Sequence, residues 1–149
     1  MVLGLGNPLM GDEGVGVALV QSLGLAGAAH PAVDFVDAGT GGLAIVHQLD
    51  GRTKAVFVDC AFMGQAPGTI RRFMPNQVAS VKGLSGLSAH EGDLLRILEM
   101  ARSLGQCPAE VVFFGIEPEK VEPGTGLSEC LKGRWPEYLK LISMELTCS

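Results

Sequence analysis

Two adjacent acids, Asp12 and Glu13, lie in a glycine-rich stretch at the start of the sequence, MVLGLGNPLMGDEGVG. A dinucleotide-binding loop in this position needs the pattern Gly-x-Gly-x-x-Gly, but Leu9 stands where the third glycine would be. Carboxylates would also repel a phosphate from the start of the following helix. The stretch therefore favours a cation as the ligand. The alternative is structural: Asp12 caps the helix, and Glu13 adds a favourable charge to its first turn.

Two more acids follow apolar segments further along the chain. Asp37 follows the segment 33–36, and Asp59 lies near the end of AVFVDC, residues 55–60. Like Val2–Leu5, these segments are short and apolar, which is typical of parallel strands covered on both faces. Because the carboxyl ends of parallel strands meet at one edge of a sheet, we expect these acids to gather there with the first pair.

A histidine in a helical segment, His90, is the third kind of side chain that could take part. It lies in SAHEGDLL, where Ser88 and Glu91 have the spacing of a capping box, so we place it in the first turn of a helix. The positive end of a helix disfavours imidazolium, which leaves a neutral ring able to bind a metal or accept a proton. A solvated histidine, or one bonded to nearby backbone, is the alternative. We interpret His30 and His47 as structural.

Other segments complete an alternation of strands and helices that would position these side chains. We predict helices over residues 15–23, 43–49 with Thr40 as candidate cap, 88–104, and 128–146 with Pro136 bending or splitting it. EVVFFGI, residues 110–116, reads as another buried strand, whereas GTIRRF, residues 68–73, suits an antiparallel edge strand. Residues 76–87 show no clear period and should form a surface loop.

Composition limits the classes of function. The chain has 149 residues, enough for one domain with a substantial core, and carries 11 basic against 16 acidic residues. An acidic chain lacks the clustered Lys and Arg that phosphate backbones require, so we expect no nucleic-acid partner. No apolar run has the length of a membrane span, and no signal peptide is evident, so we expect no membrane insertion and a cytoplasmic location.

The four cysteines, at positions 60, 107, 130 and 148, are widely spaced and form no C-x-x-C pair. We expect reduced thiols and no zinc site built from cysteines. Cys60 alone lies near the predicted site, and we interpret it as a small core residue in preference to a nucleophile.

Five ordered blocks together resemble one known family. GLGNPLMGDEGVG, DAGTGG, VFVDC, SAHEGDLL and FGIEPEKVEPGTGLS, in this order, are similar to the hydrogenase maturation proteases, which process the large subunit of nickel-iron hydrogenases. The resemblance covers almost the whole chain. It implies a single α/β/α domain over residues 1–149, with a twisted, mostly parallel five-stranded sheet of the phosphorylase/hydrolase-like kind. The implied activity is removal of a C-terminal extension from the large-subunit precursor after nickel insertion.

The resemblance also implies roles for particular residues. The family's metal-contacting positions match Glu13, Asp59 and His90, which are also the candidate catalytic residues. Two carboxylates and an imidazole suit a borderline divalent ion such as nickel or zinc. The resemblance implies that nickel arrives with the substrate, and no organic cofactor is expected. The bound ion could polarise the carbonyl or activate water, or a carboxylate could act as general base.

The DAGTGG motif is the candidate substrate-binding loop. Asp37 matches the aspartate of the family's second-strand motif, and we expect it to face the substrate together with Gly39, Thr40 and Gly41, because glycines let a peptide approach closely. The partner is then a hydrogenase large-subunit precursor, bound by a protein that we expect to be a monomer.

Two other functions stay open from the sequence. The letters GLGNP also open the peptidyl-tRNA hydrolases, but those need a histidine soon after this loop and a basic surface, and the nearest histidine here is His30. The second alternative is a non-enzymatic sensor of a metal or a nucleotide on the same scaffold.

Overall fold

A mixed five-stranded sheet forms the centre of the molecule. The computed structural model describes residues 1–26, 30–77 and 89–147, with the backbone alone described over 89–92. The strands lie in the order β2 (Phe35–Gly39), β1 (Val2–Leu5), β3 (Lys54–Cys60), β5 (Glu110–Ile116) and β4 (Ile70–Phe73). The first four are parallel, and β4 pairs antiparallel with β5 at the edge, which confirms the predicted sheet.

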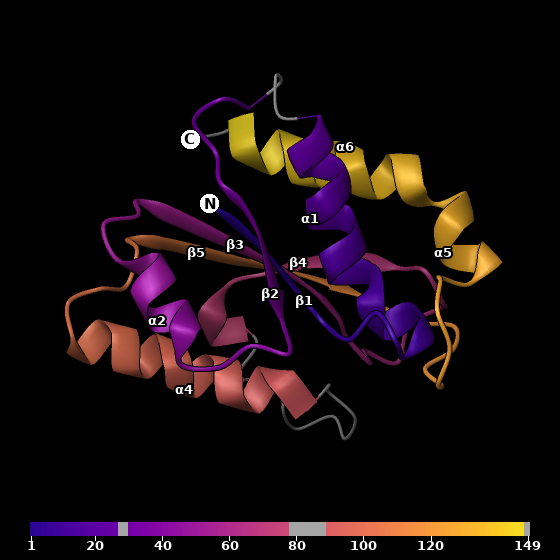
Figure 1. The fold of residues 1–149 in the computed structure, drawn as a ribbon, viewed down its shortest axis with the longest axis horizontal. Helices are drawn as coiled ribbons and strands as arrows, with labels where there is room; N and C mark the ends of the chain where they lie inside the picture. The colour runs from indigo at the N-terminus through magenta and orange to yellow at the C-terminus, as the bar shows by residue number, and fades with distance from the viewer. Residues whose placement is uncertain (27–29, 78–88, 148–149) are drawn as a thin grey trace.

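Helices cover both faces of this sheet (Figure 1). One face carries α1 (Val15–Leu25), α5 (Glu129–Gly133) and α6 (Trp135–Thr147), and the other carries α2 (Ala44–Leu49) and α4 (Ala89–Ser103). The predicted α/β/α arrangement is therefore confirmed.

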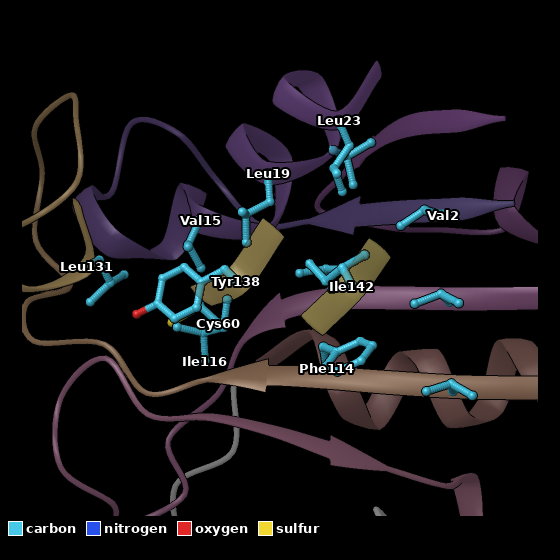
Figure 2. Packing of buried hydrophobic residues seen from close by; sticks show 14 residues of the cluster. Val2, Val15, Leu19, Leu23, Cys60, Phe114, Ile116, Leu131, Tyr138 and Ile142 are labelled. Carbon is cyan, nitrogen blue, oxygen red and sulfur yellow. The ribbon is translucent and has the colours of Figure 1, made fainter. Parts of the chain in front are cut away.

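The alternation of side chains along the central strands divides the core into two layers. Val56, Val58 and Cys60 of β3 face α1 and α6, where Tyr138 and Ile142 lie over the sheet (Figure 2). Phe57 faces the opposite layer and stacks on the ring of Phe113, with 5.3 Å between ring centroids. Neither face of β3 reaches solvent, as an uninterrupted apolar run predicts.

Close packing of α1 on the sheet depends on two glycines. A Cβ atom on Gly4 would lie 2.3 Å from the carbonyl oxygen of Gly16, and one on Gly16 would lie 2.2 Å from that of Val58. No side chain fits at either position, so the backbones of α1, β1 and β3 touch directly. Gly16 thus allows the helix–strand contact that the third glycine allows in dinucleotide-binding loops.

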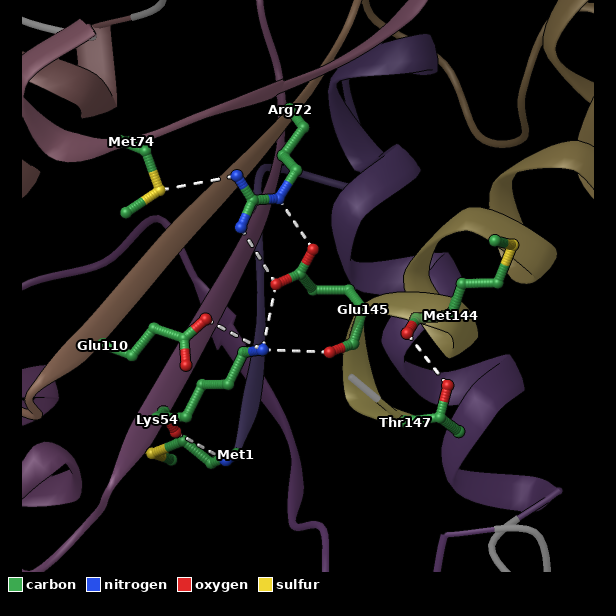
Figure 3. A network of polar contacts seen from close by, with 8 residues as sticks. All are labelled: Met1, Lys54, Arg72, Met74, Glu110, Met144, Glu145 and Thr147. Carbon is green, nitrogen blue, oxygen red and sulfur yellow. Dashed lines mark hydrogen bonds and ion pairs between the residues drawn. The ribbon is translucent and has the colours of Figure 1, made fainter. Parts of the chain in front are cut away.

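A polar network ties α6 to the amino-terminal edge of the sheet (Figure 3). The ammonium of Lys54 on β3 lies 2.9 Å from Glu145 of α6 and 3.0 Å from Glu110 of β5. Arg72 of β4 donates two further hydrogen bonds to the Glu145 carboxylate, at 2.7 and 3.1 Å. Glu145 therefore joins a helix to two strands at once.

Two local predictions are wrong, and a third is confirmed. Thr40 does not cap α2, which begins at Ala44 with Leu43 at the cap and no side-chain cap bond. The second strand is Phe35–Gly39 instead of 33–36, because pairing with β1 continues through Asp37 to a register shift. The predicted splitting of the last helix is confirmed: it forms α5 and α6, and Pro136 lies in the first turn of α6, where no N–H is needed.

The helix predicted to carry His90 can be compared with the structure only in part. The helix predicted over 88–104 is confirmed as α4, while its cap at Ser88 and most of the predicted loop 76–87 lie outside the described residues.

Candidate functional site

The predicted acids lie at the edge where the parallel strands end. Glu13 belongs to a 3-10 helix, η1 (Gly11–Gly14), that follows β1 and contacts β3. Asp59 is the last residue but one of β3, the strand beside β1, and Asp37 is in β2 on the other side of β1. The topology therefore brings all three acids to one edge of the sheet.

The Cys60 thiol lies among the carboxylates at this edge. Its side chain is buried, and this burial raises its pKa far above the usual range, with further contributions from the charges of Asp59 and Glu13. A thiol held protonated in this way is a poor nucleophile. This supports its interpretation as a core residue. Cys60, Cys107 and Cys130 are all free thiols, and the fourth cysteine lies outside the described residues.

Asp59 is oriented by its own strand. It is 6% exposed, and its Oδ1 accepts a hydrogen bond of 2.8 Å from the backbone N–H of Cys60. This contact fixes the carboxylate against the end of β3, and Glu13, at the same edge of the sheet, is half-buried.

Asp12 does not have the capping role that was one of the alternatives left open by the sequence. It is 0% exposed, and neither η1 nor α1 has a side-chain cap bond. Its Oδ2 accepts hydrogen bonds from the N–H groups of Glu119 (2.9 Å) and Lys120 (3.0 Å), and its Oδ1 accepts one from that of Ser128 (2.7 Å). The two adjacent acids thus differ: Asp12 turns inward to bind the loop after β5, and Glu13 is left at the edge of the sheet.

Glu117, which the sequence analysis did not single out, has a related role. It is 7% exposed and directly follows β5. Its Oε2 accepts hydrogen bonds from the N–H groups of Met63 (2.6 Å) and Gln65 (3.2 Å), in the loop after β3. Like Asp37, Glu117 directly follows an apolar segment in the sequence, and this pattern could have identified it.

Asp37 holds the start of the glycine loop. Its Oδ1 accepts a hydrogen bond of 2.9 Å from the N–H of Gly39, and its Oδ2 accepts one of 3.2 Å from the Gln21 side chain. Gly39 (φ +52°) and Gly42 (φ +116°) adopt left-handed backbone conformations, and nothing lies within 4 Å of where their Cβ atoms would be. The backbone of this loop is therefore open to a ligand.

A groove lies beside this loop. Its volume is about 490 Å³, and it lies between the β2–α2 connection and α4; its lining residues are Thr40, Gly41, Gly42, Leu43, Asp93, Arg96, Ile97 and Met100. Leu43 and Met100 are 64% and 45% exposed, so the groove offers apolar side chains to an occupant.

His90 lies in the first turn of α4, as predicted, but its side chain is outside the described part of the chain. Within that part, no group of three or more His, Cys, Asp or Glu side chains could hold a metal ion. Glu13 and Asp59 supply two oxygen donors of the kind that divalent cations accept. Their convergence with His90 stays a prediction.

Similarity to known proteins extends over nearly the whole chain. The family model described as hydrogenase maturation protease matches residues 17–145. The chain belongs to the hydrogenase maturation protease family. It is 30% identical over 129 residues to the hydrogenase 2 maturation protease of Escherichia coli, a match that covers 86% of this chain and 78% of the relative.

Another relative in this family is longer. The hydrogenase expression/formation protein HoxM of Cupriavidus necator is 33% identical over 122 residues, which cover 82% of this chain and 60% of the relative. The chain thus spans less than two thirds of that protein's length.

Solved structures share the fold. The hydrogenase maturating endopeptidase HybD from E. coli aligns with a TM-score of 0.80 at 26% identity, over 95% of this chain and 87% of that one. HybD from Thermococcus kodakarensis, at 21% identity, aligns with a TM-score of 0.82 over 97% of both chains. No helix in the described residues is both long and apolar enough to cross a membrane.

Proposed function

We propose that the chain is an endopeptidase that removes the C-terminal extension of a nickel-iron hydrogenase large-subunit precursor after nickel insertion. The observation that carries this proposal is the placement of Glu13 and Asp59 at one edge of the sheet in a member of the hydrogenase maturation protease family. Family membership favours this function over a peptidyl-tRNA hydrolase or a non-enzymatic sensor. We propose the cytoplasm as its location, since the described cysteines are all free thiols.

Nickel is, on this proposal, part of the substrate. Glu13, Asp59 and His90 would contact it as a set of two carboxylates and one imidazole, which suits nickel but gives modest affinity for the free ion. The bound ion would supply Lewis acidity toward the scissile carbonyl or toward water. The chain's own part is to hold the two carboxylates beside the bond to be cut, where either one can act as general base.

The precursor polypeptide would lie along the glycine loop and the groove next to it. Gly39 has open space beside its backbone, Thr40 and Gly41 line the groove, and Leu43 and Met100 give apolar contacts. Asp37 would face the polypeptide from the start of this loop and would not bind the metal. This arrangement assigns the metal and the peptide to neighbouring parts of one edge.

The test is incubation with nickel-loaded and nickel-free precursor, with the products read by mass spectrometry. Cleavage of the nickel-loaded form alone is expected, and depletion of metal from the enzyme should have no effect. Glu13→Ala and His90→Ala should abolish processing without unfolding the domain, whereas Glu129→Gln, an exposed change on α5, should not affect it. A purified protein that retains stoichiometric zinc and cleaves nickel-free precursor would contradict the proposal.

A further inference from the structure

We infer that Asp12 and Glu117 are positioning residues, which set the separation between Glu13 and Asp59 by tying three loops into one unit. The inference rests on the proposed function for the roles of Glu13 and Asp59. The ties themselves are contacts of buried side chains with backbone.

The first tie joins the loop after β1 to the loop after β5. Besides the three bonds to the Asp12 carboxylate, the N–H of Asp12 donates to the carbonyl of Lys120 at 3.1 Å. The N–H of Gly11 donates to the carbonyl of Gly124 at 3.0 Å, and the N–H of Gly124 donates to that of Leu9 at 2.9 Å. Glu13 directly follows residues 9–12, which are hydrogen-bonded to the loop after β5. That loop therefore sets the backbone position of Glu13.

The second tie joins the same loop to the one that follows Asp59. Glu117 binds the N–H groups of Met63 and Gln65 through a single oxygen. The N–H of Ala61 also donates to the carbonyl of Ile116 at 2.9 Å. The segment 116–128 is therefore a bridge, with the loop that carries Glu13 at one end and the loop after Asp59 at the other.

Buried carboxylates are costly means of holding loops together. Burying a charge is unfavourable unless hydrogen bonds compensate, and removing an acceptor leaves buried N–H groups without partners. Loss of a group that hydrogen-bonds a metal ligand directly weakens metal binding by about 10- to 100-fold, and we take this range for Asp12 and Glu117, which act on the loops next to the predicted ligands. The position of the two ties, behind the two predicted metal contacts, is what this role requires.

The number of oxygens used by each acid predicts a difference between conservative variants. Asp12 uses both oxygens, so Asp12→Asn must turn an NH₂ group toward backbone N–H groups and lose one side of the tie. Glu117 uses one oxygen for both bonds, so Glu117→Gln can keep them while Glu117→Ala cannot. Glu122→Gln is the matched control, because Glu122 is an exposed acid of the same loop that pairs with Lys120.

Two measurements distinguish the positioning of Glu13 and Asp59 by Asp12 and Glu117 from the proposed function itself. The first is independent of activity: hydrogen exchange at residues 119, 120 and 128, together with NMR shifts of the Glu13 and Asp59 carboxyl carbons. The second is nickel affinity by calorimetry, alongside kcat and KM for cleavage of the nickel-loaded precursor. Circular dichroism establishes that each variant is folded at the temperature used.

We expect Asp12→Asn and Glu117→Ala to move the carboxyl shifts, weaken nickel binding by about 10- to 100-fold and lower kcat more than they raise KM. Glu117→Gln and Glu122→Gln should resemble the parent protein. Folded Asp12→Asn protein with unchanged carboxyl shifts, or with changed shifts and unchanged nickel binding, would overturn the inference. If the parent protein neither binds nickel nor cleaves the precursor, the proposed function is refuted. The NMR shifts of the Glu13 and Asp59 carboxyl carbons would then still test whether Asp12 and Glu117 position these two residues.

Discussion

At the scale of single residues, one substitution can remove the charge of Asp37 and keep its hydrogen bonds to the glycine loop and Gln21. Asp37→Asn keeps an oxygen for the Gly39 N–H, and the Gln21 amide can turn to satisfy the new NH₂ group. We expect unchanged stability and nickel affinity but a loss of about tenfold or more in kcat/KM, the equivalent of one charged hydrogen bond. Precursor cleavage assays and calorimetry measure these quantities.

The control for Asp37 is Asp34→Asn, because Asp34 lies just before the same strand and pairs with Arg52. It should cleave like the parent protein. Loss of nickel binding in Asp37→Asn would instead place Asp37 among the metal contacts.

A second prediction at this scale concerns Cys60, whose thiol stays protonated because burial and the surrounding carboxylates raise its pKa. In the folded protein, iodoacetamide should label Cys107 and Cys130, both partly exposed, and leave Cys60 unmodified until urea is added. Peptide mass spectrometry measures the labelling. Cys60→Ala should keep proteolytic activity, and its loss would indicate a chemical role for the thiol.

At the scale of elements, the contact of α1 with the sheet predicts opposite effects for two glycines of one helix. Gly16→Ala would place a Cβ atom 2.2 Å from the Val58 carbonyl, so we expect a loss of about 3 kcal/mol or more in the free energy of unfolding. Gly24→Ala meets Phe35 at 3.4 Å and gains helix propensity, so it should be neutral or stabilising by up to about 1 kcal/mol. Urea denaturation measures both, and equal stability for the two variants would contradict this packing.

The elements also show how far the sequence could be interpreted. The apolar runs predicted β3 and β5 to within one residue, because a buried strand leaves a composition that few other structures share. The inward turn of Asp12 was not predictable, since its partners lie 107 to 116 residues away along the chain. Thr40 failed as a cap for a local reason: the glycine backbone carries the chain further before α2 begins.

At the scale of the whole molecule, the network around Glu145 predicts how stability depends on pH. Its hydrogen bonds with Arg72, followed by that with Lys54, lower the Glu145 pKa from 4.5. The charged carboxylate therefore stabilises the folded state. This contribution is fully present above pH 4.5, the pKa of a free glutamate, and is lost as the pH falls through the lower pKa of the folded state. The parent protein should lose more stability over this interval than Glu145→Gln does.

At neutral pH, Glu145→Gln should lower the free energy of unfolding by about 2 kcal/mol, because it weakens bonds that join α6 to two strands. Glu129→Gln is the control, since Glu129 is an exposed partner of Lys132 and should change little. Thermal unfolding across pH distinguishes the two, and parallel pH profiles for Glu145→Gln and the parent would contradict the assignment.

The loops at the carboxyl edge are held in two different ways, and this has a consequence for how such proteins diversify. The loops after β1, β3 and β5 are bonded to one another through buried carboxylates, whereas the glycine loop after β2 is held by the Asp37 side chain and by a backbone hydrogen bond of 2.7 Å from the Gly6 N–H to the Gly39 carbonyl. On the proposed function, the first three loops would keep Glu13 and Asp59 in place, and the glycine loop would contact the polypeptide. On the proposed function, substitutions at Thr40 and Leu43, which line the groove, would change which polypeptide is bound, whereas the glycines with positive φ between and beside them would have to be kept.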